Sequence, residues 1–129
     1  MITVARRSAP NNKSAAIVED DEELIFVYSR ILRNLGYSPV FVARNGEELI
    51  RWISGNVASP GVVIMEYGLP TISGLDAARE VLRRSPRTKI IMATTHDEIR
   101  EKAASLGLSF LPKPFSLKEL VRKMDAGKT

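Results

Sequence analysis

The chain has 129 residues, of which 44% are hydrophobic and 26% are charged, a composition typical of one soluble globular domain. It contains no cysteine, which excludes disulfides, thiolate catalysis and cysteine–zinc sites. It also lacks the roughly 20 consecutive apolar residues of a membrane span, and residues 1–14 lack the apolar run of a secretory signal. We therefore predict a cytoplasmic protein without membrane contact.

The formal net charge of +4 raises the question of nucleic-acid binding. Basic residues gather at 5–7 and 83–89, but no aromatic side chains alternate with them, as stacking on bases requires. We expect these residues to lie on a solvated surface and not to bind nucleic acid directly.

In chain order, short apolar runs alternate with stretches of helical period. The run at 15–18 leads into the acidic segment EDDEE and then into a helix that ends near a capping glycine, Gly36. A second run at 38–43 precedes a helix with Asn45 as its N-cap and Glu48 three residues later, which is the spacing of a capping box. The expected apolar face of the first helix consists of Leu24, Tyr28, Ile31, Leu32 and Leu35.

Three further strand–helix pairs follow. The predicted strands lie at 61–65, 89–94 and 109–112, and the first of these is too apolar for either of its faces to meet water. The helices after them present the apolar residues Leu75, Ala78, Val81 and Leu82, then Ile99, Ala103 and Leu106, and finally Leu117, Leu120, Val121 and Met124.

This alternation predicts an α/β fold, a doubly wound parallel sheet of five strands with helices on both faces. We assign residues 14–126 to this domain and residues 1–13 to an N-terminal extension. Ligands of such sheets bind beyond the carboxyl ends of the strands. The functional residues are therefore expected among those that follow the predicted strands, namely Glu19, Asp20, Asp21, Glu66, Thr94, Thr95 and Lys113.

Acids, a hydroxyl and an ammonium in one crevice suit a phosphoryl group held by a divalent metal. Clustered carboxylates need a compensating positive charge, and Mg²⁺ combines carboxylates, a backbone carbonyl and phosphate oxygens in one coordination sphere. An adjacent aspartate can carry the phosphoryl group as an acyl phosphate, while a hydroxyl and a lysine bind its remaining oxygens. Position 66 is where this nucleophile would have to lie, and it holds a glutamate.

Four segments, in this order, resemble the receiver domains of two-component response regulators, and in particular the chemotaxis-type single-domain members. They are IVEDDE (17–22), VVIMEYGLPTISG (62–74), IIMATT (90–95) and FLPKPF (110–115), each at the end of a predicted strand. The resemblance covers about residues 15–126. It implies a flavodoxin-like (βα)5 fold with strand order 2-1-3-4-5, and a switch controlled by phosphorylation that signals by protein contact.

The resemblance also implies roles for individual residues. Glu66 occupies the phosphoacceptor position, and Glu19 and Asp20 occupy the acidic positions that bind Mg²⁺. Glu66 itself and the backbone carbonyl of Gly68 would be further metal ligands.

Three other positions match the switch of the family. Thr94 matches its hydroxyl and Lys113 its lysine, and Pro114 suggests a cis peptide bond that turns this lysine toward the site. Phe110 lies where the family has a rotameric aromatic residue, more usually tyrosine. Because phenylalanine has no hydroxyl, we expect that a hydrogen-bonded inward state is not available to it.

Glu66 departs from the family, whose acceptor is an aspartate. The additional methylene extends the side chain by ~1.5 Å, into the space of the phosphoryl oxygens and closer to Thr94 and Lys113. We predict that Glu66 is not efficiently phosphorylated and partly imitates the phosphorylated aspartate, with one negative charge against roughly −2 for a phosphoryl group. Whether Glu66 is native or an engineered substitution stays open.

Simpler roles are expected for several other residues. Asp21, Glu22 and Glu23 complement the dipole at a helix N-terminus, His96 is an exposed loop residue, and Trp52 packs against the core. The resemblance places partner contacts or a homodimer on the surface of the fourth helix, fifth strand and fifth helix, although a plain solvated surface stays open. This surface carries Arg100, Lys102, Lys118, Arg122 and Lys123.

An alternative function is a Mg²⁺-dependent phosphatase or phosphotransferase that uses the same acids. It would need an aspartate nucleophile and a second acid, and neither is evident. A dinucleotide-binding module is excluded because no G-x-G-x-x-G follows the first strand. We therefore interpret the chain as a signalling module and not an enzyme. A sensor histidine kinase would act on an aspartate form, and a downstream protein or an output domain would receive the signal; their identities, and whether the chain is a fragment, stay open.

Overall fold

The computed structural model describes residues 10–55 and 59–125. These residues form a parallel sheet in the order β2-β1-β3-β4-β5, which confirms the predicted fold and strand order. The strands are β1 (Pro10–Val18), β2 (Val40–Ala43), β3 (Ser59–Met65), β4 (Lys89–Thr94) and β5 (Ser109–Pro112). The helices are α1 (Glu22–Asn34), α2 (Gly46–Ser54), α3 (Gly74–Arg84), α4 (Arg100–Ser105) and α5 (Leu117–Asp125), with a 3₁₀ turn, η2 (Asp97–Ile99), directly before α4.

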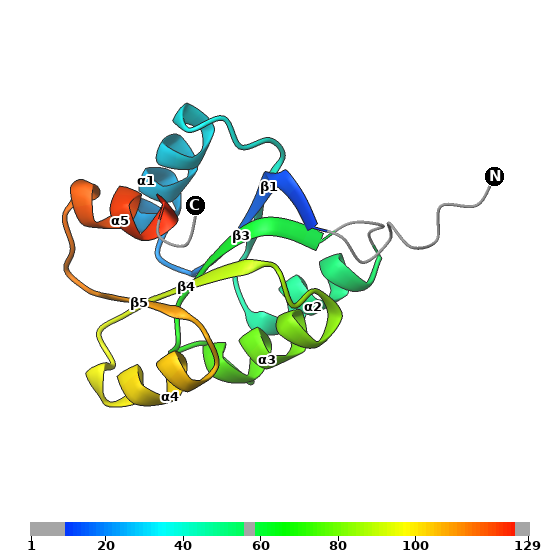
Figure 1. The fold of residues 1–129 in the computed structure, drawn as a ribbon, viewed down its shortest axis with the longest axis vertical. Coiled ribbons are helices and arrows are strands. Elements are labelled where there is room, and N and C mark those ends of the chain that lie inside the picture. The colour runs from blue at the N-terminus through cyan, green and yellow to red at the C-terminus, as the bar shows by residue number, and fades with distance from the viewer. Residues whose placement is uncertain (1–9, 56–58, 126–129) are drawn as a thin grey trace.

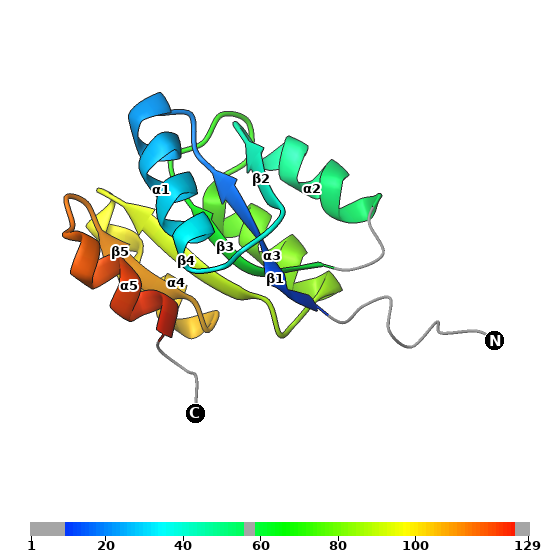
Figure 2. The same ribbon diagram turned by 90° about the horizontal axis from the view of Figure 1, so that it is seen from above.

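Helices cover both faces of the sheet. Helices α1 and α5 pack on one face, and α2, α3 and α4 pack on the other (Figures 1 and 2). Successive residues of β1 alternate between the layers: Ala15 and Ile17 belong to the α1–α5 cluster, whereas Ala16 and Val18 belong to the cluster with α2, α3 and α4. All four side chains are fully buried. This explains why the central strands are apolar without interruption.

Strand β1 is longer than predicted, because it begins at Pro10 and not at residue 15. Its first residues pair with β3, Pro10 with Ser59 and Asn11 with Pro60, before an irregularity between Asn11 and Ala15. The segment PNNKS has no apolar alternation, so periodicity could not identify it. Residues 1–9, which include the basic cluster at 5–7, lie outside the described residues, and the boundary of the N-terminal extension stays a prediction.

The C-terminus of α1 has the predicted glycine cap. Gly36 has a φ of 96°, and its N–H donates to the carbonyl of Arg33 at 3.0 Å. The N–H of Tyr37 donates to the carbonyl of Leu32, also at 3.0 Å. These two bonds form a Schellman motif, which needs a residue in a left-handed conformation and therefore favours glycine.

The start of α2 shows a capping arrangement close to the predicted one. The Asn45 Oδ1 accepts a hydrogen bond from the Glu48 N–H at 2.9 Å. The Glu48 carboxylate accepts from the N–H of Arg44, at 2.7 Å, and not from Asn45 itself. The carboxylate thus binds the residue before the cap, which fixes the turn from β2 into α2.

Replacing Asn45 with alanine is expected to lower the free energy of unfolding by about 1 kcal/mol, because the first turn of α2 loses its side-chain acceptor. Urea denaturation monitored by circular dichroism measures this change. Asn34→Ala, at the exposed last residue of α1, is the matched control and should change the free energy by less than about 0.5 kcal/mol. Equal effects of the two substitutions would contradict the capping role.

Two residues assigned to apolar helix faces are exposed instead. Leu35, the C-cap residue of α1, is 45% exposed, and Leu117, the first residue of α5, is 58% exposed. Both lie at helix ends, where no other described element covers the side chain. The predicted strand at 38–43 also begins later, at Val40, after a cis Ser38–Pro39 peptide bond. In the part of the chain that the structure describes, no helix is both long enough and apolar enough to span a membrane.

Candidate functional site

Four residues at the carboxyl ends of four different strands meet at one edge of the sheet. Glu19 follows β1, Glu66 follows β3, Thr94 ends β4, and Lys113 follows β5. The strands are parallel and their last residues are in register, with Val18 beside Met65 and Met65 beside Met92. The carboxyl ends of parallel strands therefore bring these side chains together, as predicted.

The Glu66 carboxylate accepts hydrogen bonds with both of its oxygens. Its Oε1 lies 2.6 Å from the Lys113 Nζ. Its Oε2 accepts from the Thr94 hydroxyl at 2.5 Å and from the Gly68 N–H at 2.8 Å. The Gly68 N–H makes this bond, and the expected role of the Gly68 carbonyl as a metal ligand stays a prediction. The carboxylate is thus bound by an ammonium, a hydroxyl and a backbone amide at once.

Lys113 connects the two buried acids. Its Nζ lies 3.0 Å from the Glu19 Oε1, in addition to its contact with Glu66. The side chains are only 14% (Lys113), 4% (Glu19) and 11% (Glu66) exposed. The Lys113–Pro114 peptide bond is cis, as predicted. One ammonium therefore faces two carboxylates in a largely dry site.

The pKa values of this group follow from burial and from the shared ammonium. Burial raises the pKa of Glu19 above its usual value, and the contact with Lys113 only partly offsets this. Burial acts in the same direction on Glu66, but hydrogen bonds from Lys113, Thr94 and Gly68 together hold the pKa of Glu66 below its usual value. For Lys113, burial lowers the pKa, yet the bonds to Glu66 and Glu19 raise it overall. Glu66 and Lys113 are therefore both charged at neutral pH.

Tyr28 of α1 brings a hydroxyl close to this group, and sequence reasoning treated it only as a core residue. The side chain is 1% exposed, and its hydroxyl has no hydrogen-bond partner among the described residues. Burial raises its pKa strongly, and the negative charges of Glu19, Glu66 and Asp21 raise it further. The ring stacks on Phe115 with 6.0 Å between centroids. Tyr28 therefore stays neutral.

The predicted Mg²⁺ ligands do not form a ready site in this arrangement. Glu19 and Glu66 are both occupied by Lys113, and Asp20 is exposed. Across residues 10–55 and 59–125, no three carboxylate, histidine or cysteine side chains are arranged to hold a metal ion. The use of Mg²⁺ by this chain therefore stays a prediction, and the cation that faces the acids is the lysine.

The loop between β3 and α3 sets the position of Glu66. An ideal Cβ at Gly74 would lie 2.3 Å from the carbonyl oxygen of Glu66 and 2.8 Å from the Cα of Tyr67, so only glycine fits there. The Gly74 N–H donates to the carbonyl of Tyr67 at 2.8 Å. Thr71, in the same loop, has a φ of 71°. The loop between β3 and α3 thus packs closely against the backbone of Glu66, whose side chain lies in the site.

Thr94 also connects Glu66 to the segment before α4. Its hydroxyl donates to Glu66 and accepts from the His96 N–H at 3.2 Å. The His96 ring packs edge-on against Tyr67, with 5.1 Å between centroids, and its Nδ1 lies 3.0 Å from a Glu98 carboxylate oxygen. His96 is a loop residue as predicted, but its contacts with Tyr67 and Glu98 were not foreseen.

Two aromatic residues belong to the core cluster on the face of the sheet that α2, α3 and α4 cover. Trp52 is partly buried and stacks on Phe41, with 4.4 Å between centroids, which confirms its packing role. Phe110 of β5 is 7% exposed and belongs to the same cluster. The ring of Phe110 therefore takes the inward position, although it has no hydroxyl that could form a hydrogen bond there.

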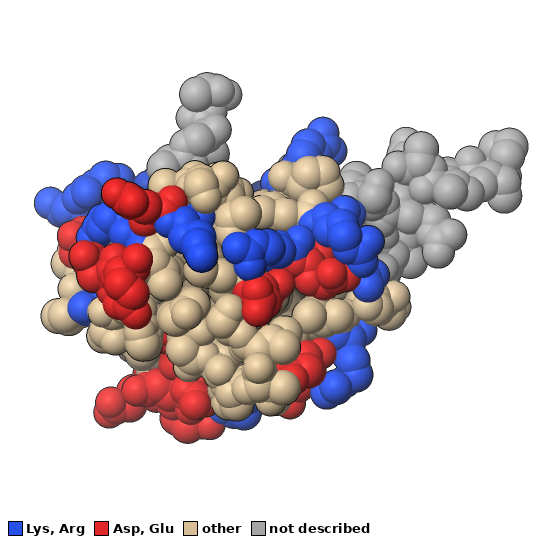
Figure 3. Space-filling model, turned by 90° about the horizontal axis from the view of Figure 1, so that it is seen from below, with Lys and Arg blue, Asp and Glu red and all other residues tan. Residues whose placement is uncertain are grey.

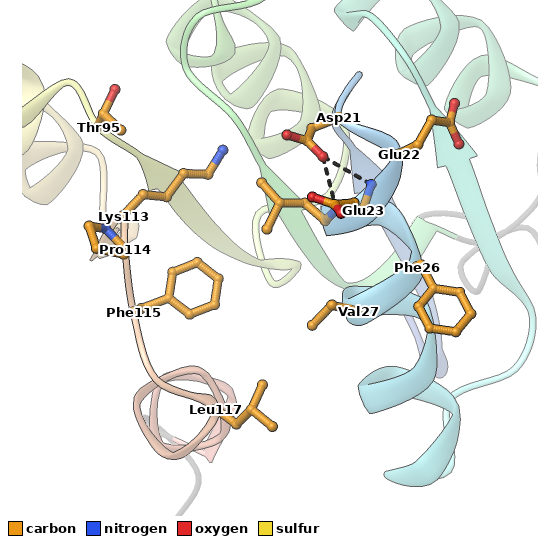
Figure 4. Close-up of a pocket in the computed structure, with 11 residues that line it drawn as sticks. Asp21, Glu22, Glu23, Phe26, Val27, Thr95, Lys113, Pro114, Phe115 and Leu117 are labelled. Atoms are coloured by element: carbon orange, nitrogen blue, oxygen red, sulfur yellow. Dashed lines mark hydrogen bonds between the residues drawn. The ribbon is translucent and has the colours of Figure 1, made fainter.

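An apolar groove of about 930 Å³ borders the site between α1 and the segment after β5. Figure 4 shows Lys113 extending toward the start of α1, and the ring of Phe115 directed into the groove toward Val27. Acidic residues lie at the α1 end, where the carboxylate of Asp21 caps the helix by accepting from the N–H groups of Glu23 and Leu24. The exposed Leu117 lines the groove, which explains why its side chain is not buried in the core.

Charges of both signs are mixed on the face formed by α3 and α4, as Figure 3 shows. On α3, Arg79 pairs with Asp76, and Arg83 and Arg84 both pair with Glu80. Two of the four basic residues at 83–89, Arg83 and Arg84, are thus paired with an acid on their own helix. This supports the expectation of a solvated surface and not of a nucleic-acid site.

Among protein-family models, that of the response regulator receiver domain matches residues 15–125. Response regulator MprA from Mycobacterium sp. (strain KMS) is 32% identical over 113 residues, which are 85% of this chain and 48% of that protein. The alkaline phosphatase synthesis transcriptional regulatory protein PhoP from Bacillus subtilis (strain 168) is 26% identical over 118 residues, 89% of this chain and 48% of that protein. The chain therefore spans about half the length of the curated relatives it matches.

Solved structures with the same fold include two in which magnesium is bound. Response regulator TrrA from Thermotoga maritima, in complex with Mg²⁺–BeF, superposes with a TM-score of 0.74 at 30% identity, covering 88% of this chain and 96% of that one. The receiver domain of sensor histidine kinase PA1611 from Pseudomonas aeruginosa PAO1 has a magnesium ion in its active-site cleft. It superposes with a TM-score of 0.74 at 28% identity, covering 88% and 94% of the two chains.

Proposed function

This chain belongs to the response regulator receiver domain family, and from that membership we propose that Glu66 holds the domain in a state resembling the phosphorylated one. A receiver domain is the signalling module of a two-component response regulator. In the proposed state, no phosphoryl group is transferred to position 66. The carboxylate of Glu66 takes the place of the anion instead.

One observation supports this proposal above all others. The Glu66 carboxylate is bound by the three kinds of donor that would bind phosphoryl oxygens: a lysine ammonium, a threonine hydroxyl and a backbone N–H. An aspartate is one methylene shorter, so its own carboxylate would reach these donors less far and would leave room for a phosphoryl group. Glu66 brings the anion to them within its own side chain.

Lys113 is proposed to act as the resident counterion of the site. Its ammonium lies between Glu19 and Glu66, so Mg²⁺ would have to compete with it for both carboxylates. Mg²⁺ dehydrates reluctantly and needs near-octahedral geometry. We therefore expect weaker binding of Mg²⁺ by this chain than by its Glu66→Asp variant.

We also propose that the domain has no enzymatic activity of its own. A Mg²⁺-dependent phosphatase would need a nucleophile with free access to phosphorus, whereas both oxygens of Glu66 are engaged. The signal would instead pass by contact through the surface of α4, β5 and α5, to a downstream protein, an output domain or a second copy. A sensor histidine kinase would be the partner of an aspartate form, and a cytoplasmic location stays a prediction.

Incubation with acetyl phosphate and Mg²⁺ tests this proposal. We expect no gain of 80 daltons in the intact mass, because Glu66 is crowded against Thr94 and Lys113 and an acyl phosphate would not fit among the donors. Mass spectrometry of the intact protein measures the gain, and peptide mapping locates it. Rapid phosphorylation of Glu66 would refute the proposed role.

Glu66→Asp is the positive control for the same experiment. The shorter side chain opens the space beside Thr94 and Lys113, so this variant is expected to gain 80 daltons at residue 66. If neither protein is modified, the remaining residues of the site are insufficient for phosphorylation. In that outcome the identity of residue 66 would not be the reason for the lack of transfer, and the role of Glu66 would be contradicted.

A further inference from the structure

The side chain of Arg100 lies over the ring of Phe110. The Arg100 guanidinium carbon lies 4.5 Å from the Phe110 ring centroid. Phe110 is buried in β5, whereas Arg100, the first residue of α4, is exposed. A guanidinium within about 6 Å of an aromatic face is attracted to it, and the stem of the side chain covers apolar surface. Arg100 therefore lies between the buried Phe110 ring and the solvent.

Arg100 is held over the ring by a second contact. Its Nη2 lies 2.8 Å, and its Nε 3.3 Å, from the Asp97 Oδ1. Asp97 is the first residue of η2, and η2 leads directly into α4. The two nitrogens that bind Asp97 fix the plane of the guanidinium, which a single contact would not do.

The segment that carries Asp97 is joined to the Glu66 site. The Asp97 N–H donates to the carbonyl of Thr95 at 3.0 Å. The next residue back, His96, donates its N–H to the Thr94 hydroxyl, and this hydroxyl donates to Glu66. A continuous series of contacts thus runs from Glu66 through Thr94 and the 95–97 segment to Arg100.

We propose that Arg100 is a positioning residue that holds Phe110 inward, with Asp97 as its tether. Phe110 has no hydroxyl that could form a hydrogen bond in the inward position. The cation–π contact with the Arg100 guanidinium stabilises this position instead. The partner surface of α4 and β5 then presents a cation at this point and not an aromatic ring. The inference deepens the proposed function, because Thr94 and Glu66 fix the segment that carries the tether.

Fluorine NMR of protein labelled with 4-fluorophenylalanine tests this role. The chain has four phenylalanines, Phe26, Phe41, Phe110 and Phe115, so the spectrum has four signals. A soluble paramagnetic agent relaxes exposed fluorines faster, and the exposed Phe26 is an internal reference. Arg100→Gln is expected to raise the outward population of Phe110 roughly two- to five-fold, the effect of losing one cation–π contact. The relaxation of Phe26 should not change.

Arg79→Gln is the matched control. Arg79 pairs with Asp76 three residues earlier, at 2.8 Å, as Arg100 pairs with Asp97, but it lies on α3 and does not cover Phe110. The control should leave the Phe110 signal unchanged. If Arg100→Gln and Arg79→Gln give the same Phe110 relaxation, the proposal is overturned.

Two further variants separate the cover from its tether and from protein stability. Asp97→Asn, which keeps the cation but weakens the tether, is expected to shift Phe110 in the same direction by a smaller factor. No shift with Asp97→Asn would overturn the tether. If Arg100→Gln fails to fold, Arg100→Lys takes its place and should give a smaller rise, because lysine keeps the charge but not the planar fork; no rise would overturn the role of Arg100.

The outcome is independent of the phosphorylation experiment. If acetyl phosphate modifies the wild-type chain, the role of Glu66 fails, yet Arg100→Gln would still expose Phe110. If Glu66 stays unmodified and Arg100→Gln leaves Phe110 buried, only the role of Arg100 fails.

Discussion

Replacing Lys113 with alanine is expected to lower the free energy of unfolding by about 3 to 5 kcal/mol. The substitution leaves the carboxylates of Glu19 and Glu66 buried without the cation that both of them contact. In a buried site the two carboxylates repel each other, and each has lost most of its hydration. One or both must therefore take up a proton, or the site must open to water. Urea denaturation monitored by circular dichroism measures the loss.

Two further variants test this explanation for Lys113. Lys102→Ala removes an exposed lysine of α4 and should change the free energy of unfolding by less than about 0.5 kcal/mol. Adding Glu66→Gln to Lys113→Ala removes one of the two stranded charges and should recover part of the lost stability. If the double variant is no more stable than Lys113→Ala, the effect comes from lost packing and not from uncompensated charge.

Gly74→Ala is expected to destabilise the domain by about 3 kcal/mol, at the upper end of the usual cost of overpacking. The new methyl group would lie 2.3 Å from the Glu66 carbonyl oxygen and 2.8 Å from the Tyr67 Cα. Both neighbours are backbone atoms, so no side-chain rotation can relieve the clash. For a domain of this size, the melting temperature should fall by roughly 10 °C.

The same substitution should also move Glu66 relative to its donors. Backbone amide shifts of Gly68 and Thr94 report this movement by NMR. Gly55→Ala is the matched control, because an ideal Cβ there meets its nearest atom at an ordinary 3.6 Å and the backbone φ is −92°. It should be neutral or slightly stabilising. Equal losses at the two glycines would contradict the steric explanation.

The principal site residues could be found from the sequence because their positions follow from the topology. An apolar run marks a buried parallel strand, and the residue after it must lie at the carboxyl edge of the sheet. Glu19, Glu66 and Lys113 were identified in this way, and the structure brings them within hydrogen-bonding distance. The strand order itself did not follow from periodicity and came from the resemblance of four segments to a known family.

Other features depend on atoms that meet only after folding. Nothing in the local sequence indicates that Arg100 lies over Phe110, since the two residues are ten positions apart on different elements. Periodicity identified Leu117 as apolar, but it cannot tell a core position from the wall of a groove. The start of β1 was missed because the segment there shows no apolar alternation, although its backbone pairs with β3.

The covalent attachment of the Glu66 carboxylate bears on how long such a signal would last. An acyl phosphate is a reactive mixed anhydride that water eventually cleaves, which returns the protein to its unphosphorylated state. The carbon–carbon bonds of a glutamate side chain have no comparable hydrolysis. A receiver held in this way would therefore not switch itself off by hydrolysis. The strength of its signal in the cell would be set by how fast the polypeptide is synthesised and degraded.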